Sequence, residues 1–100
     1  MFEKKSIIYS EAIGVCVVED ITKLSANKNS LPIAYYVLRS IQNKDRVSYI
    51  PVQNHSVHLR ELISPNEAQI KLDTKTKLNE LERNEIKYVL EHSEQKVVNQ

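Results

Sequence analysis

The chain has 100 residues, of which 41% are hydrophobic and 27% charged, values that suit one globular domain and exclude both a large multi-domain enzyme and a disordered chain. Its 14 Lys and Arg against 13 Asp and Glu leave a net charge of +1, and the even spread of these charges indicates no basic surface that grips nucleic acid by charge alone. No apolar run is long enough to span a bilayer and residues 7–9 form too short an apolar stretch for a secretory signal, so we expect a cytoplasmic protein.

The first half of the sequence has the composition of a β-sheet. Residues 5–52 contain short blocks of β-branched and aromatic side chains, separated by clusters of Asn, Ser, Asp and Pro, which is typical of strands joined by turns. In the last of these blocks Ser48 and Ile50 share one face, so Tyr49 lies on the other and should be exposed. The predicted strands are residues 6–10, 13–22, 33–41 and 46–52, with a possible short fifth at 57–60.

Two residues mark expected irregularities of this sheet. Gly14 is the single glycine of the sequence, and a lone glycine in a strand usually marks a bulge or a close approach of another part of the chain. Asn43 lies in the expected hairpin turn at residues 42–45 and is the residue predicted to be left-handed there. These features favour a small, strongly bent antiparallel sheet or barrel.

The pattern changes at Ser64, where helices are predicted. Ser64 supplies a capping hydroxyl, Pro65 suits the first helical position and Glu67 follows three positions after the cap. Asp73 and Thr74 then offer a break and a new cap, so a second helix should follow. It carries an apolar stripe, with Ile86 at the margin, that must be buried. We expect the stripe to fold back on the sheet of the same chain, the alternative being a homodimer through helix packing. The stripe consists of Leu78, Leu81, Tyr88 and Val89.

Few residue patterns indicate chemistry. His55 and His58 have the spacing H-x-x-H, but two ligands fall short of the three or four that zinc requires. Cys16, the single cysteine, lies in a predicted strand among valines, where nothing in the sequence indicates an activating base. One glycine is too few for most phosphate-binding loops. The sequence therefore predicts a protein that is not an enzyme and has no metal and no cofactor.

Several segments agree with one known family in their order and spacing. They are FEKKSIIY (residues 2–9), GVCVVEDI (14–21), YYVLR (35–39), YIPV (49–52) and LR (59–60). Together they resemble the RNA polymerase-interacting domain of the CarD/CdnL family, which is also found in bacterial transcription-repair coupling factors. The resemblance implies a Tudor-like domain at residues 1–63, with residues 64–100 as a short helical C-terminal segment. The expected fold class is α+β, with about five antiparallel strands followed by two helices.

The resemblance also implies a function. It is that of a non-catalytic bacterial transcription regulator that docks on the RNA polymerase β subunit by β-strand addition and modulates transcription initiation. Strand addition uses the unpaired N–H and C=O groups of an edge strand. The implied polymerase-binding residues lie at the end of the second strand and in or beside the fourth. They are Lys23, Leu24, Arg46, Val47, Tyr49 and Pro51.

This sequence departs from the family pattern at informative positions. Family members carry basic residues at the positions of Leu24 and Tyr49, so contact here would rest on backbone pairing and on apolar or tyrosine side chains. Lys23 and Arg46 are the nearby basic residues that would substitute. The chain has no tryptophan, whereas the DNA-binding second domain of CarD-type proteins uses one, so we expect only weak or indirect contact with promoter DNA.

Two other functions fit the same residues. One is a small-barrel nucleic-acid-binding module of the KOW or Tudor kind, and the other is a structural protein that self-associates through the same strand edge. Binding to nucleic acid should weaken steeply as salt rises, whereas backbone pairing should not. We expect a monomer that binds the polymerase and not a membrane.

Overall fold

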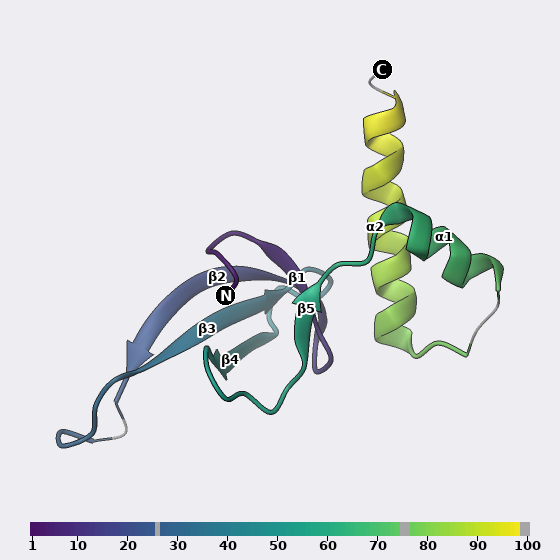
Figure 1. Cartoon of the computed structure of the whole chain (residues 1–100). Coiled ribbons are helices and arrows are strands. Elements are labelled where there is room, and N and C mark those ends of the chain that lie inside the picture. Colours follow the sequence, from purple (N-terminus) through teal and green to yellow (C-terminus); the bar gives the residue numbers. More distant parts are fainter. Residues whose placement is uncertain (26, 75–76, 99–100) are drawn as a thin grey trace.

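The computed structural model describes residues 1–25, 27–74 and 77–98, with side chains as far as His92. Five strands precede two helices along the chain (Figure 1). The strands are β1 (Ile7–Ser10), β2 (Gly14–Leu24), β3 (Ile33–Ser40), β4 (Val47–Pro51) and β5 (Leu59–Glu61), and the helices are α1 (Pro65–Asp73) and α2 (Glu80–Val98).

All neighbouring strands are antiparallel, and they lie in the order β4-β3-β2-β1-β5. This arrangement confirms the predicted α+β fold, with a bent sheet followed by two helices. The sheet is open and does not close into a barrel, so β4 and β5 are its two edges. Neither helix, within the residues described, is long and apolar enough to cross a membrane.

β2 and β3 form the longest part of the sheet. They curve together into a two-stranded arm that projects away from the helices (Figure 1). β2 runs to Leu24, two residues past its predicted end, because Lys23 and Leu24 still pair with Ala34 and Ile33. A register shift between Val18 and Asp20 marks a bulge in this strand, and a bulge bends the strand and increases its twist.

The bulge therefore does not lie at Gly14. The other role predicted for this glycine was a close approach to its backbone, and the structure shows a close approach by a side chain of α2. Gly14 has a φ of +79°, and a Cβ atom there would lie 3.0 Å from Cδ2 of Leu81 in α2. The left-handed backbone favours a residue without a side chain, and the close contact with Leu81 leaves little room for one. Gly14 thus permits the contact between α2 and the start of β2.

The prediction that Asn43 is left-handed is wrong. In the described residues, positive φ outside glycine occurs at Lys5 and Asn54. The Oδ1 atom of Asn43 accepts a hydrogen bond from the Asp45 N–H at 3.1 Å, and its carbonyl oxygen accepts one from the Arg46 N–H at 2.9 Å. The side chain of Asn43 therefore closes the turn without a left-handed residue.

The main core lies on one face of the sheet, as the alternation of side chains predicts. Tyr36 and Leu38 of β3 are fully buried, and Ile50 of β4 is 7% exposed. Tyr49, next to Ile50, is 56% exposed, which confirms its predicted position on the opposite face. The buried members of this core are Ile8, Ile13, Cys16, Val18, Tyr36, Leu38, Ile50 and Leu59.

Helix α1 begins where the sequence predicts. The Ser64 hydroxyl accepts a hydrogen bond from the Glu67 N–H at 3.1 Å, and Pro65 occupies the first turn. The predicted new cap at Asp73 and Thr74 is wrong, because Thr74 is the C-cap of α1. The next helix begins only at Glu80.

Asn79 and Glu82 instead cap the start of α2. The Asn79 Oδ1 atom accepts from the Glu82 N–H at 2.8 Å, and the Glu82 Oε1 atom accepts from the Asn79 N–H at 3.1 Å. This reciprocal pair is a capping box, with Asn in the place of the more usual Ser or Thr.

The apolar stripe of α2 packs only in part on the sheet, where it is predicted to lie, and most of it packs on α1. Ile86, predicted at the margin, is 4% exposed and forms a second core with Val89 and with Ala68 of α1. The stripe shifts toward Ile86 because α1 covers that side of α2. Leu81 lies on the other side, against Gly14 at the start of β2.

Candidate protein-binding surface

β4 is an edge strand, and its hydrogen bonds to β3 fix which of its backbone groups are paired. Just before β4, the carbonyl oxygen of Arg46 accepts from the Ser40 N–H at 3.0 Å. Just after β4, the Val52 N–H donates to the carbonyl oxygen of Ala34 at 2.9 Å. Backbone groups alternate in direction along a strand, so the even-numbered positions between these two bonds also face β3.

The odd-numbered positions of β4 therefore direct their backbone groups away from the sheet. Val47 and Tyr49 each present an N–H and a C=O, whereas Pro51 presents only a C=O. Proline is tolerated in a sheet at such an edge position, where it removes no bond to a neighbouring strand. The free side of β4 is thus a short row of donors and acceptors of the kind to which another strand can pair.

The side chains of the same residues belong to an apolar surface on the outer face of the sheet. Tyr49 lies opposite Val37, and Pro51 lies opposite Tyr35. Residues paired directly across antiparallel strands share a face, so this surface continues from β4 over β3 to the end of β2. We call it the outer apolar face, and it consists of Leu24, Ile33, Tyr35, Val37, Val47, Tyr49 and Pro51.

Several side chains of the outer apolar face are open to solvent. Leu24 and Ile33 pair with each other near the tip of the arm, and both are exposed, as is Tyr49. Tyr35, Val47 and Pro51 are half-buried, and Val37 is buried. Exposed apolar side chains gathered on one face commonly mark a site of interaction with another protein. Four of the predicted site residues therefore share this face. Val47, Tyr49 and Pro51 lie together on β4, whereas Leu24 lies near the tip of the arm, opposite Ile33.

The two predicted basic residues lie elsewhere. Lys23 pairs with Ala34 and so points to the opposite face from its neighbour Leu24. The Arg46 guanidinium donates to the carbonyl oxygen of Ala12 at 3.2 Å, in the turn between β1 and β2. Neither residue adds positive charge to the outer apolar face, so the structure does not group them with the other four.

Arg39 is the basic residue that does share this face, and its charge is neutralised. It lies opposite Val47 and forms an ion pair with Glu19, with 3.1 Å between Nη2 and Oε1. Hydrogen bonding to Arg39 lowers the pKa of the Glu19 carboxyl below its ordinary value, so the pair is charged at neutral pH. Contact through this face would therefore be apolar and through the backbone, rather than through cations.

Sequence reasoning did not include Ile33, Tyr35 and Val37 among the site residues. The signal was present, because alternation along β3 places these side chains on the face opposite Tyr36 and Leu38. Val37 is nevertheless buried on that face, at 9% exposure, whereas Ile33 is 53% exposed. What the sequence lacks is the register that places Val37 beside Tyr49.

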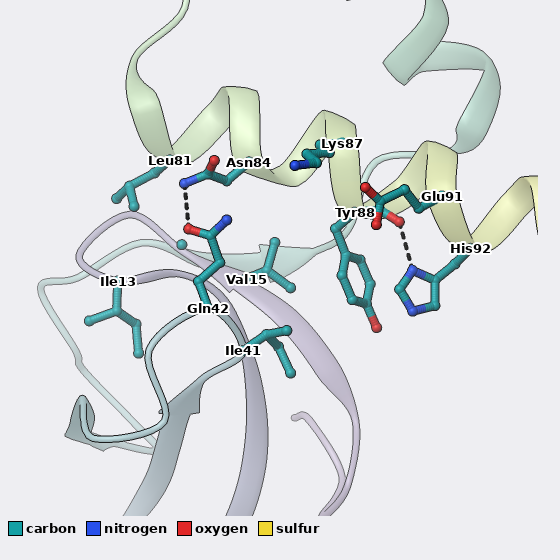
Figure 2. A pocket seen from close by; sticks show the side chains of 11 residues that line it. Ile13, Val15, Ile41, Gln42, Leu81, Asn84, Lys87, Tyr88, Glu91 and His92 are labelled. Atoms are coloured by element: carbon teal, nitrogen blue, oxygen red, sulfur yellow. Dashed lines mark hydrogen bonds between the residues drawn. The ribbon is translucent and has the colours of Figure 1, made fainter.

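Apart from the outer apolar face, a cavity lies where α2 meets the sheet (Figure 2). This cavity of about 450 Å³ is lined by residues from the turn before β2, from the end of β3 and from α2. The Asn84 amide donates to the Gln42 side-chain oxygen at 2.7 Å across its mouth. The rings of Tyr88 and His92 lie 3.9 Å apart between centroids, and His92 Nδ1 is 2.8 Å from the Tyr88 carbonyl oxygen.

The Asn84–Gln42 hydrogen bond links α2 to the segment that follows β3, whereas the contacts between Tyr88 and His92 lie within α2. Burial raises the pKa of the Tyr88 hydroxyl above its ordinary value, so the ring is neutral at physiological pH. The lining residues come from positions far apart in the sequence, around 13–15, 41–42 and 81–92, so no local pattern indicates the cavity.

The residues considered for metal binding or catalysis form no such site. His55 Nδ1 is 2.6 Å from the Val57 carbonyl oxygen, and the backbone N–H of His58 donates to Glu11 Oε1 at 2.9 Å. Across the described part of the chain, no group of three or more His, Cys, Asp or Glu residues is arranged to hold a metal ion. Burial raises the pKa of the Cys16 thiol to about 12, so this thiol is protonated at neutral pH.

No model of a known protein family matches this chain, and no curated protein matches it. The resemblance to the CarD/CdnL domain therefore stays a prediction from the residue pattern. The free edge of β4 and the outer apolar face are independent of that resemblance, because they follow from the strand order and register.

Proposed function

We propose that this chain is a non-catalytic module that binds another protein by adding β4 to that protein's sheet, and that the partner is the bacterial RNA polymerase β subunit. One observation carries the binding mode. Val47, Tyr49 and Pro51 combine unpaired backbone groups at a sheet edge with side chains on the outer apolar face. The residue pattern shared with the CarD/CdnL domain supports the choice of partner and a role in regulating transcription initiation.

In this binding mode, backbone and side chains make different contributions. The N–H and C=O groups of Val47 and Tyr49, with the C=O of Pro51, would pair with a partner strand and set its register. The ring of Tyr49, flanked by Val37 of β3, would be buried against the partner and contribute apolar contact. A tyrosine suits this role because it offers a large contact area at a small cost in conformational entropy.

Two variants at Tyr49 separate these contributions. Tyr49→Ala removes the ring but keeps the backbone N–H, and should weaken binding to purified bacterial RNA polymerase by about tenfold, the effect of losing 1 to 2 kcal/mol. Tyr49→Pro also removes the outward N–H and should weaken binding further, while leaving the bonds to β3 in place. Biolayer interferometry would measure the affinities, with circular dichroism to verify the fold.

Leu31→Ala is a matched control, because Leu31 is an exposed apolar residue outside the outer apolar face. It should bind as the wild type does. Unchanged affinity in both folded Tyr49 variants would contradict docking through β4.

Salt dependence tests the alternative function in nucleic-acid binding. Strand pairing and apolar contact should keep the affinity for polymerase nearly constant between about 0.05 and 0.3 M salt, whereas binding to phosphates would weaken steeply. Mobility-shift titration with duplex DNA should show only weak binding, at about 10⁻⁴ to 10⁻⁶ M. Submicromolar, salt-sensitive binding to DNA would favour the nucleic-acid module instead.

A further inference from the structure

An apolar groove lies between the two helices, away from the sheet. It has a volume of about 450 Å³ and is formed by the end of α1, the residue Leu78 that precedes the cap of α2, and one side of α2. Its apolar lining consists of Leu72, Leu78, Ile86 and Leu90. Leu72 is 52% exposed, although it adjoins the second core, so the core opens to solvent at this point.

The rim of the groove is mostly positive. Among the residues whose side chains the structure describes, Lys71, Arg83 and Lys87 border it, and Glu91 is the one carboxylate. Within the residues that the structure describes, the ion pairs are those of Lys4, Arg39 and Arg60, so the three rim cations have no carboxylate partner there. The local charge of +2 contrasts with the net charge of +1 for the whole chain.

We propose that this groove binds an acidic amphipathic helix of a partner protein. A helix places apolar residues at i, i+3 or i+4, and i+7 on one side, which suits an apolar groove between two helices. Carboxylates flanking that apolar side would meet Lys71, Arg83 and Lys87. Such pairing orients the incoming helix and increases its association rate.

The apolar lining and the balance of charge decide between this occupant and others. Nucleic acid would use the cations but would leave the four apolar side chains without a contact. A second copy of this chain would bring the exposed Ile70 and Leu72 of α1, but with Lys71 between them, which the rim cations would repel. This inference stands apart from docking through β4, because it concerns a separate surface on the helices.

Two designed helical peptides of about 18 residues, long enough to form helix on binding, provide the test. Both carry leucines at helical spacing on one side, and their remaining positions are mainly Glu in the first peptide and Lys in the second. Fluorescence anisotropy with the full chain should show that the Glu peptide binds at least about tenfold more tightly than the Lys peptide, the difference expected from complementary against like charges.

Substitutions in the groove test whether the peptide binds there. The double variant Arg83→Glu, Lys87→Glu should weaken binding of the Glu peptide by at least about tenfold, and Leu72→Asp should weaken it similarly by placing a charge in the apolar lining. The control Lys28→Glu, Lys44→Glu makes the same change in net charge at exposed positions beside the sheet and should have little effect. Tyr49→Ala should also bind normally, which keeps this result distinct from docking through β4.

Five results would overturn the proposal. The first four are equal binding of the two peptides, binding of neither, an equal loss in the charge-reversed variant and its control, and tighter binding to phosphatidylglycerol vesicles than to the Glu peptide. A dimer in sedimentation that Leu72→Asp dissociates into folded monomers would identify a second copy as the occupant and would also overturn it.

Discussion

Arg60 of β5 and Glu85 of α2 form a bidentate ion pair, with the two guanidinium nitrogens 2.7 and 2.9 Å from the carboxylate oxygens. Glu85 is 1% exposed, and it also accepts a hydrogen bond from the Ile63 N–H at 3.1 Å. The Arg60 guanidinium lies 4.2 Å above the ring centre of Tyr9 in β1. One buried carboxylate thus connects α2 to the last strand and to the segment that leads into α1.

Removal of this carboxylate should destabilise the fold. Glu85→Ala leaves Arg60 and the Ile63 N–H without their partner, and breaking a buried ion pair typically costs 3 to 5 kcal/mol. We expect about 3 kcal/mol, near the low end of that range, because the Arg60 side chain is 30% exposed and can be hydrated. Urea unfolding followed by circular dichroism would measure the loss.

Glu91→Ala is the matched control for that experiment. Glu91 is an exposed glutamate on the same helix, and its replacement should change the free energy of unfolding by no more than about 0.5 kcal/mol. Equal effects of the two substitutions would show that the ion pair with Arg60 contributes no special stability.

The capping box at the start of α2 leads to a second prediction. Asn79→Ala removes the acceptor for the Glu82 N–H and should lower the free energy of unfolding by about 1 kcal/mol. Asn79→Ser restores a capping oxygen and should recover most of that loss. Ser64→Ala at α1 should have an effect of similar size, because its hydroxyl makes the equivalent bond to Glu67. If Asn79→Ala left the urea midpoint unchanged, the cap would not form in solution.

Gly14 should not tolerate a side chain. Gly14→Ala places a methyl group 3.0 Å from Leu81 Cδ2 and imposes a left-handed backbone on alanine, which costs about 1 to 2 kcal/mol by itself. The methyl contact is with the end of a flexible side chain, so Leu81 can move, but the backbone cost remains. Adding Leu81→Ala should therefore not restore the stability lost in Gly14→Ala. Recovery of wild-type stability in the double variant would show that the contact alone requires glycine.

Sequence reasoning succeeded where local patterns determine the structure. Alternation placed Tyr49 and Ile50 on opposite faces, and the Ser64, Pro65 and Glu67 pattern located the start of α1. It failed where two local signals competed. Asn43 has a side chain that can close a turn as an acceptor or tolerate a left-handed backbone, and the sequence alone does not say which will occur.

Features that depend on contacts between distant residues were not predicted. Glu85 has the charge of an exposed helical residue, and only the approach of Arg60 and Ile63 makes its burial favourable. Likewise, the basic groove between α1 and α2 depends on how Lys71 comes to lie near Arg83. The apolar pattern of each helix, taken alone, does not show which residues of α1 will lie near which residues of α2.

The last prediction concerns the effect of pH on stability through Cys16. This thiol is fully buried in the main core, with Sγ 3.7 Å from the Ile8 carbonyl oxygen. Burial raises the pKa of the thiol from 9.0 to about 12 in the folded chain. The unfolded chain therefore releases this proton near pH 9, whereas the folded chain retains it until about pH 12.

Because the unfolded state binds fewer protons in that interval, the contribution of Cys16 is fully present below pH 9 and is lost as pH rises toward 12. One proton gives a slope of at most about 1.4 kcal/mol per pH unit. Cys16→Ala lacks this titration, so its free energy of unfolding should fall less steeply than that of the wild type between about pH 9 and pH 11. Urea unfolding under reducing conditions should show the two curves converging as pH rises, since the variant begins lower through the small cavity left by the missing sulfur. Parallel curves would mean that the thiol has the same pKa in both states and is accessible to water in the folded chain.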